Sequence, residues 1–367
     1  MVPSKAKATP GTCALLGSGE RTGVGRRVLS TLLREIDEPR TIAVLDTPAG
    51  FQPNHIQVAE KIVHFLTENL AEFHPRPSLV ETRRTALDTE LSITMLATLA
   101  RSRCIVAGPG SPTYMIRELK DTSYLDAIRH AHTNGTAICM SSAASIALSA
   151  SSIPVYEIFK VGEDLHWHGG LDFFGPFGMS LAIVPHWNNH EGGAEVDTRF
   201  CYMGKARFEA LLALLPSEIV ILGIDEHSAC IMDFSSATVS IEGKGGAYIV
   251  RDGHLIAFSS GDTFPMSLLG AHVGSPQQSA ASPFVYELMR AEPLTPPATI
   301  LDPRIEEEAL AKKIPPQLID AILAVRTELR NAKHWAWTDQ LRDALTACGI
   351  VVEDTSIGSR WYIAEMD

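Results

Sequence analysis

Short apolar runs alternate with helical stretches through the first 150 residues of the chain. The expected strands are TCALLG, TIAVLDT, SLVETR, RCIVAG and GTAICM, at residues 12–17, 41–47, 78–83, 103–108 and 135–140. Between them apolar residues recur at helical spacing, as at Ile56, Ile62, Leu66 and Leu70. This alternation predicts parallel pairing in a doubly wound α/β sheet, in which ligands bind at the carboxyl ends of the strands.

From about residue 180 the pattern changes to short strands separated by turn residues: SLAIVP, EIVILGI, SACIMD, TVSIEG, GAYIVR and HLIAFSS. We expect them to form an antiparallel extension of the same domain. The following stretch is rich in proline and serine and is typical of a linker. The sequence therefore predicts an α/β domain over residues 11–273, a linker over 274–300 and a separate module over 301–367.

The C-terminal module shows two apolar stripes at helical spacing. The stripes are formed by Leu318, Ile322, Val325 and Leu329, and by Trp337, Leu341 and Leu345. Gly349 is placed to end the second helix, and IVVED follows as a short strand. We expect a pair of helices followed by this strand.

Composition narrows the classes of protein that fit. The apolar fraction is 45% and the charged fraction 20%, so the chain can bury a core and is not disordered throughout. A formal charge of −12 disfavours attraction of nucleic acid or anionic membranes by the overall field. The sequence shows neither a secretory signal nor a membrane-spanning run. Its six cysteines form no C-x-x-C pair. We therefore expect a cytoplasmic protein with reduced thiols.

The most informative local pattern is a strand, a tight turn and a helix around Ser142. GTAICM runs directly into Ser141, Ser142 and small residues, which exposes a hydroxyl at the sheet edge. His186 ends another apolar strand and is the candidate base. Glu157 is the candidate acid that orients this base. The alternatives for the acid are Glu163, Asp164, Asp225 and Glu226.

Six motifs occur in a characteristic order: LLGSGE, TPAGFQPN, AGPGSP, SSAAS, PHW and GIDEHSA. Over roughly residues 12–265 this series resembles the cyanophycinase and aspartyl dipeptidase family, serine peptidases on a fold like that of class I glutamine amidotransferases. The resemblance implies a mostly parallel α/β fold and a Ser142–His186–Glu157 triad. It also implies an oxyanion hole formed around Gly110, Ser111 and Ala143, and a small peptide or isopeptide substrate with an acidic residue on the acyl side.

The turn departs from the family pattern in its flanking positions. Met140 and Ala144 stand where the G-x-S-x-G pattern has glycine, and an alanine in a positive-φ position is strained. Three alternatives stay open. Ser141 could be the exposed hydroxyl, Cys139 could supply a thiol nucleophile, or the chain could be a binding protein without catalysis.

Further residues are expected to line the substrate cleft. They are Gly19, Glu20, Gln52, Asn54, Trp187, Asn188, Asp225 and Glu226. A second group, His166, His168, His190 and Glu191, contains metal-ligating residue types near His186, but its spacing matches no compact zinc pattern. We predict neither a metal nor a cofactor.

The C-terminal segment carries a second resemblance. NAKHWAWTDQLRDALTACGIVVEDTSIGSRW, at residues 331–361, is similar to the C-terminal tail of cysteinyl-tRNA synthetases, which implies a link to tRNA. From residue 315 onward, however, the sequence contains five basic and eight acidic residues, which gives a net charge of −3. A phosphate-binding face usually has the opposite balance. We therefore favour a docking or homodimerisation module over a tRNA partner, and a small peptide-like substrate for the α/β domain.

Overall fold

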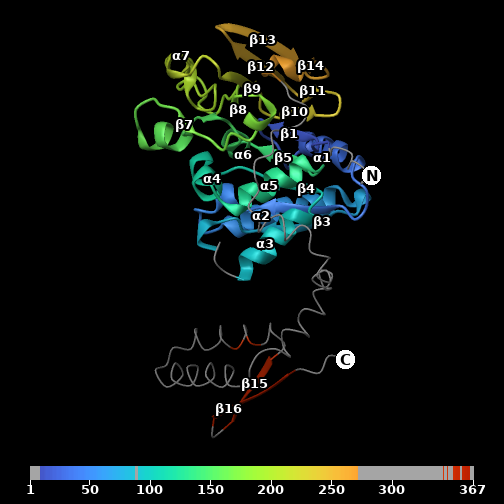
Figure 1. Cartoon of the computed structure of the whole chain (residues 1–367). Coiled ribbons are helices and arrows are strands. Elements are labelled where there is room, and N and C mark those ends of the chain that lie inside the picture. Colours follow the sequence, from blue (N-terminus) through green and yellow to red (C-terminus); the bar gives the residue numbers. More distant parts are fainter. Residues whose placement is uncertain are drawn as a thin grey trace, which may run out of the picture. The chain divides into compact units, whose positions relative to one another are not determined.

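The computed structural model describes residues 9–86, 90–271, 342, 345, 350–355 and 358–363. The chain divides into two compact units, residues 1–290 and 291–367 (Figure 1). In the second unit, the strand expected from IVVED is confirmed as β15 (Ile350–Thr355), which pairs antiparallel with β16 (Gly358–Ile363). The expected linker and, apart from the helical positions 342 and 345, the two expected helices lie outside the described residues.

The first unit is built on an eight-stranded sheet with the order β14-β11-β10-β1-β5-β4-β2-β3. Neighbouring strands from β1 to β3 in this order are parallel, as the alternating sequence pattern predicts. The β10, β11 and β14 strands extend the sheet antiparallel beyond β1. The strands are β1 (Cys13–Leu16), β2 (Thr41–Leu45), β3 (Arg76–Val80), β4 (Cys104–Ala107), β5 (Ala137–Ser141), β10 (Ser228–Asp233), β11 (Thr238–Gly243) and β14 (Thr263–Pro265).

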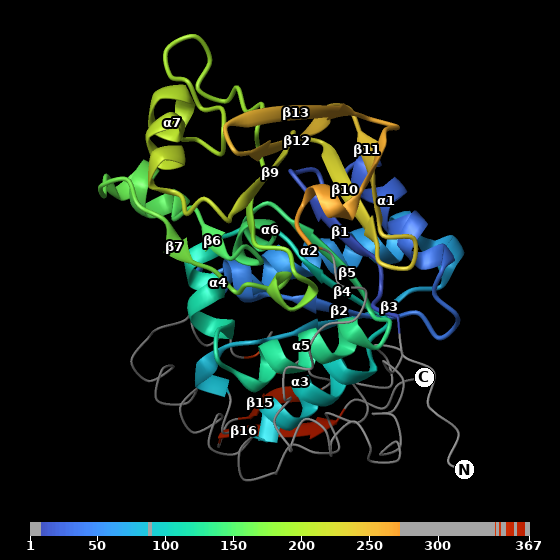
Figure 2. The same cartoon turned by 45° about the horizontal axis from the view of Figure 1, so that its top comes forward.

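A second sheet has the order β13-β12-β9-β8 and lies beside the antiparallel end of the first (Figures 1 and 2). The expectation of one antiparallel extension is therefore only partly right, because the later strands divide between two sheets. Moreover, β8 and β9 are parallel to each other, while β12 and β13 are antiparallel to their neighbours. The strands are β8 (Leu181–Val184), β9 (Val220–Ile224), β12 (Gly246–Arg251) and β13 (His254–Ser259), and a short pair is formed by β6 (Ser151–Ser152) and β7 (His168–Gly169).

Helices cover both faces of the central sheet (Figure 2). Apolar residues of α1 and α2 pack on one face, and those of α3, α4 and α5 pack on the other, so two buried clusters sandwich the strands. A third cluster joins the second sheet to α7. The helices are α1 (Gly23–Arg34), α2 (His55–Asn69), α3 (Glu90–Arg101), α4 (Pro112–Leu119), α5 (Ser123–Thr133), α6 (Ala143–Ala147) and α7 (Gly204–Leu214).

Short helical turns connect these elements, and several border the candidate site. Of these, η4 is a single turn of π-helix. Such turns are rare in proteins, and those that occur are often at functional sites. The turns are η1 (Thr47–Ala49), η2 (Ala71–Phe73), η3 (Arg84–Ala86), η4 (Glu157–Val161), η5 (Gly175–Phe177) and η6 (Met266–Leu268). Among the described residues, no helix combines the length and the apolar character needed to cross a bilayer.

Candidate active site

Four strand ends supply the polar groups of the candidate active site. Gly110 follows β4 and Ser142 follows β5, and these two strands are parallel neighbours in the central sheet. His186 follows β8 and Glu226 follows β9, which are parallel neighbours in the second sheet. Because parallel neighbours end at the same edge, each pair of groups is brought together by its strands.

Ser142 occupies a sharp turn between β5 and α6. Its backbone has φ 53° and ψ −117°, a conformation that non-glycine residues rarely adopt. The Ser142 amide donates to the Leu16 carbonyl oxygen at 3.1 Å, which ties the turn to the end of β1. The predicted strand–turn–helix corner is thus present, and the strain is located at the serine itself.

The two positions that lack the family's glycines tolerate side chains. Met140 lies within β5 and Ala144 within α6, and both are buried in the cluster on the α3–α5 side. Neither has a positive φ angle. The expectation that Ala144 is strained in a positive-φ position is therefore wrong, because Ser142 alone makes the sharp turn.

A chain of hydrogen bonds runs from the serine to a carboxylate. Ser142 Oγ lies 2.8 Å from His186 Nε2, and His186 Nδ1 lies 2.9 Å from Glu226 Oε1. Since a carboxylate oxygen only accepts, Nδ1 carries a proton and donates a hydrogen bond to Glu226, and in this tautomer of the neutral imidazole Nε2 accepts from the serine hydroxyl. This is the hydrogen-bond pattern of a serine–histidine–acid triad.

The carboxylate that contacts His186 is that of Glu226 and not that of Glu157, which differs from the sequence prediction. Glu157 lies at the start of η4, where its Oε1 accepts a hydrogen bond from Thr113 Oγ1 at 2.6 Å. Glu226 was among the sequence alternatives, and it follows the β9 strand in the way His186 follows β8. The positions of the two glutamates in the sequence do not show which one lies beside the histidine, whereas the hydrogen bond from His186 does.

Two asparagines after the base hold Glu226 in place. Asn189 Nδ2 donates to Glu226 Oε1 at 2.8 Å, and the Glu226 amide donates to Asn188 Oδ1 at 2.8 Å. The hydrogen bond from His186 is the main cause that lowers the pKa of the Glu226 carboxyl, so this group is ionised at neutral pH. Asn188, predicted as a substrate contact, therefore supports the acid.

Of the three amides predicted for the oxyanion hole, the Ser111 amide is already bonded within the protein. A Cβ at Gly110 would lie 1.8 Å from the Pro48 carbonyl oxygen, so only glycine fits there. The Ser111 amide donates to that same oxygen at 2.7 Å, and this removes Ser111 from the predicted donors. Among the hydrogen bonds of the described residues, the amides of Gly110 and Ala143 have no acceptor. These two amides can serve a developing oxyanion.

The alternative nucleophiles do not reach the base. Ser141 is 1% exposed, and its Oγ donates to Glu20 Oε2 at 3.0 Å. Cys139 is buried within β5, and this burial raises the pKa of its thiol well above the usual value. Glu20 thus contacts the residue before Ser142, and Gly19 lies close to His227, which follows Glu226. The predicted Gly19–Glu20 loop borders the site.

Two other predicted substrate contacts are part of the protein interior. Trp187 is 8% exposed and stacks on Tyr248 at 5.2 Å between ring centroids. Asp225 is 4% exposed, and its Oδ2 accepts from the Gly246 amide at 2.8 Å and from the Tyr248 hydroxyl at 3.2 Å. Burial raises the pKa of the Asp225 carboxyl. Asp225 therefore joins the end of β9 to β12, and Trp187 joins the loop after β8 to β12.

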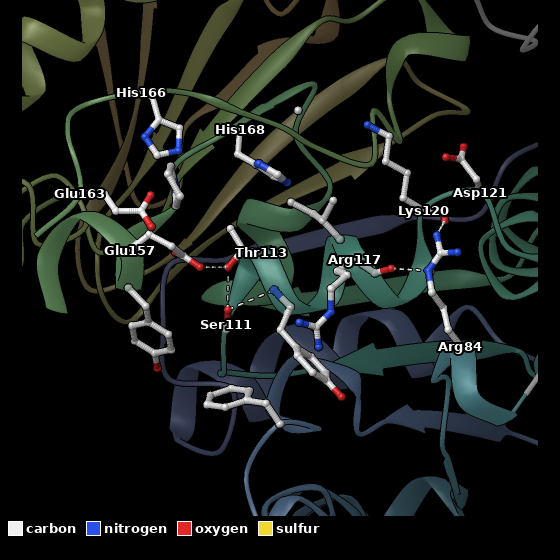
Figure 3. A pocket seen from close by; sticks show the side chains of 16 residues that line it. Arg84, Ser111, Thr113, Arg117, Lys120, Asp121, Glu157, Glu163, His166 and His168 are labelled. Atoms are coloured by element: carbon white, nitrogen blue, oxygen red, sulfur yellow. Dashed lines mark hydrogen bonds between the residues drawn. The ribbon is translucent and has the colours of Figure 1, made fainter. Parts of the chain in front are cut away.

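A pocket of about 840 Å³ begins at Ser111, next to Gly110, and extends between α4 and η4. In Figure 3 Glu157, Glu163, His166 and His168 lie on one side, and Arg84, Arg117 and Lys120 lie on the other. Two of these cations are already engaged. Arg84 Nε donates to the Arg117 carbonyl oxygen at 2.5 Å, and Arg117 pairs with Glu118 at 3.0 Å. The pocket therefore has two glutamates on one side, and on the other it has three basic side chains together with Asp121.

The remaining predictions fall near this pocket or outside it. Phe51 lines the pocket, but its neighbours Gln52 and Asn54 are not among the lining residues within the described part of the chain. Thr113, Lys120 and Tyr156 line it and were not predicted, because nothing in the local sequence distinguishes them from ordinary surface residues. Among the described residues, no group of three or more potential ligands is arranged to hold a metal ion.

Comparisons with known proteins give different matches for the two units. A family model described as the cysteinyl-tRNA ligase anticodon binding domain matches residues 315–362. Cysteine–tRNA ligases of Beutenbergia cavernae and Ectopseudomonas mendocina are 52% identical over 46 residues and 42% identical over 55. These stretches cover 12% and 15% of this chain but only 10% and 12% of the ligases. The chain thus spans about a tenth of the curated relatives it matches, and the similarity concerns this module alone.

The α/β unit is similar to a solved structure. A crystal structure of a peptidase from an acI-B1 Actinobacterium matches with a TM-score of 0.56 and 16% sequence identity, over 71% of this chain and 98% of that one. A TM-score of 0.56 over most of both chains shows a common fold, and at 16% identity it shows the fold alone. The predicted mostly parallel α/β fold with an antiparallel extension is therefore confirmed.

Proposed function

We propose that the α/β unit is a serine hydrolase that cleaves an amide bond of a small peptide or isopeptide. The observation that carries this proposal is the continuous hydrogen-bonded series Ser142–His186–Glu226, with the serine on a strained turn. A serine with only a structural role does not require a neighbouring imidazole that a carboxylate orients. Nucleophilic serines do, because the base must take the hydroxyl proton during attack.

In the first half of the proposed reaction, Ser142 Oγ attacks the substrate carbonyl carbon while its proton passes to His186 Nε2. Glu226 stabilises the resulting imidazolium through the Nδ1–H hydrogen bond. The carbonyl oxygen becomes an oxyanion and accepts hydrogen bonds from the amides of Gly110 and Ala143. His186 then donates the proton to the leaving amine as the carbon–nitrogen bond breaks, which leaves an ester on Ser142.

The second half hydrolyses this ester. Water loses a proton to His186 Nε2 and attacks the acyl carbon, the same two amides stabilise the second oxyanion, and His186 returns a proton to Ser142 Oγ. The acid product then leaves. Since every proton is transferred by one imidazole, the proposed mechanism needs no metal or cofactor.

The pocket beside Ser111 supports a small charged substrate. A volume of about 840 Å³ suits a short peptide and not a folded protein. Lys120 on one side attracts a carboxylate, as expected for an acidic residue in the substrate, and Glu157 on the other attracts an amine. Glu157 keeps one buried oxygen, Oε2, without a hydrogen-bond partner. We therefore assign Glu157 to substrate binding in place of its predicted catalytic role.

A fluorophosphonate probe tests the proposal, because it reacts preferentially with activated serines. We expect labelling of the purified full chain at Ser142, identified by peptide mass spectrometry. Ser142→Ala should abolish the label, and His186→Gln should slow labelling by about 10³-fold or more. Ser141→Ala is the matched control, since it removes the adjacent hydroxyl and should leave the label in place. Labelling that is unchanged in Ser142→Ala would exclude this proposal.

A second candidate function comes from the C-terminal match. The similarity of residues 315–362 to an anticodon binding domain favours recruitment of tRNA or of a tRNA-linked partner, with the α/β unit as a binding protein. The negative charge of this module opposes that function. The two candidates differ in whether the full chain retains tRNA at physiological salt.

A further inference from the structure

A turn immediately before α7 contains three consecutive residues in the left-handed region. Phe200, Cys201 and Tyr202 have φ angles of 55°, 57° and 68°. A side chain disfavours this region, and a run of three such residues persists only when the surrounding structure enforces it. Strain of this kind is concentrated at functional sites, so the contacts of this turn are informative.

The turn is bonded to the backbone of the candidate base. The Cys201 amide donates to the His186 carbonyl oxygen at 3.2 Å, and the Phe200 amide donates to the Trp187 carbonyl oxygen at 2.9 Å. His186 itself has φ 51°. The Trp187 amide in turn donates to the Ile224 carbonyl oxygen at 3.1 Å, at the end of β9. The left-handed turn therefore fixes the loop that carries the imidazole.

The same turn directs the Tyr202 ring toward that imidazole. The ring centroids of Tyr202 and His186 are 5.8 Å apart, with an angle of 50° between the planes. Tyr202 also contacts Phe159 of the η4 turn, at 5.3 Å, and its hydroxyl donates to Glu191 Oε2 at 2.8 Å. Burial, followed by the Glu191 carboxylate, raises the pKa of Tyr202, so the hydroxyl stays protonated. The tyrosine is thus held at the ring and at the hydroxyl.

We propose that Tyr202 is a positioning residue that keeps the His186 imidazole aligned between Ser142 and Glu226. Two hydrogen bonds fix the edges of the imidazole, but they leave the ring free to tilt about the line that joins them. Contact with the Tyr202 ring opposes this tilt. A displacement of about 1 Å at a catalytic group can lower the rate about 10²-fold, so such support is kinetically significant. This inference rests on the proposed hydrolase function.

Replacement of Tyr202 separates ring packing from the hydroxyl contact. In Tyr202→Ala we expect the maximal rate of phosphonylation by the fluorophosphonate to fall about 10-fold to 100-fold, with little change in the half-saturating probe concentration. In Tyr202→Phe the ring remains, so the rate should stay within about threefold of the wild type. Loss of rate in the alanine variant together with recovery in the phenylalanine variant identifies the ring as the positioning element.

A second measurement does not depend on activity. The proton on His186 Nδ1, shared with Glu226, gives a downfield proton signal in NMR spectra, and His186→Gln assigns it. We expect this signal to broaden or vanish in Tyr202→Ala and to persist in Tyr202→Phe. A signal and a phosphonylation rate that are both unchanged in Tyr202→Ala would overturn the inference. Failure of the wild type to react would instead overturn the hydrolase proposal, while the NMR result would still decide the role of Tyr202.

Discussion

Glu226 and Glu157 differ in what each carboxylate can do for a reaction. Glu226 accepts hydrogen bonds from His186 and Asn189, so its charge is directed at the imidazole. Glu157 accepts from Thr113 and faces the pocket. One carboxylate is suited to stabilise an imidazolium, and the other is suited to contact a substrate cation. Their amide variants should therefore affect different kinetic constants.

We predict that Glu226→Gln lowers the rate of fluorophosphonate labelling by about 10³-fold or more, because the amide favours the wrong imidazole tautomer and cannot stabilise the imidazolium. Glu157→Gln is a matched change of the same size. It should leave labelling by a small uncharged probe almost unchanged, since that probe does not occupy the pocket. Time courses of labelling measure both rates. The reverse order of effects would return the catalytic role to Glu157.

The sequence predicts those site residues whose role follows from a strand end. Ser142 and His186 each follow a buried apolar run, so their common location could be inferred before the fold was known. The roles of Glu226 and Trp187 depend on contacts between distant segments. Trp187 is buried because Tyr248, on another strand, stacks against it. A polar or aromatic residue next to a catalytic one is therefore a poor guide to substrate contact.

At the level of elements, apolar periodicity predicts the parallel strands correctly but not the division of the later strands. Strands such as β8 and β9 are buried on both faces, and a continuous apolar run does not reveal which sheet a strand joins. The helices α3 and α5 were not predicted individually. Their buried faces meet the central sheet and each other, so they form one side of the core.

Within that core, α5 carries a completely buried histidine. The His132 ring packs among Phe173, Phe177 and Phe234 at centroid distances of 5.1–5.6 Å. Its Nδ1 lies 3.3 Å from the Thr136 carbonyl oxygen, and its Nε2 has no partner. Burial lowers the pKa of His132 from 6.5 to about 4. Acid should therefore destabilise this packing.

We predict a loss of stability between pH 6.5 and pH 4 that depends on His132. The unfolded chain takes up a proton at this histidine below pH 6.5, whereas the folded chain does not until about pH 4. The free energy of unfolding is therefore unaffected by His132 above pH 6.5 and falls by about 3 kcal/mol as the pH drops to 4. Thermal unfolding midpoints measured across this range would report the loss.

A phenylalanine at this position provides the comparison. His132→Phe keeps an aromatic ring in an aromatic cluster and cannot be protonated, so its midpoint should fall less steeply with acid than that of the wild type. His64→Gln, on the exposed face of α2, should follow the wild-type curve. Parallel curves for wild type and His132→Phe would show that His132 does not contribute to acid sensitivity.

On the scale of the whole molecule, an α/β unit is joined to a module that is similar to part of a tRNA ligase. The family match favours tRNA, whereas the charge does not: the chain carries −12 overall, and the residues from 315 onward carry −3. Binding of a polyanion needs local neutralisation of phosphates by lysine and arginine. With five basic residues in this segment, a small basic face is the most that could form.

We predict that the full chain retains little tRNA at 150 mM salt, because repulsion from the acidic residues outweighs the few cations available. Filter binding with total tRNA between about 50 and 200 mM salt tests this. A triple variant, Arg326→Ala, Arg330→Ala and Lys333→Ala, is the control, since it removes three of the five cations. If wild type and variant bind equally weakly, tRNA recruitment by this module is excluded. Tight, salt-dependent binding that the variant loses would instead establish tRNA recruitment, and Ser142→Ala should leave that binding unchanged.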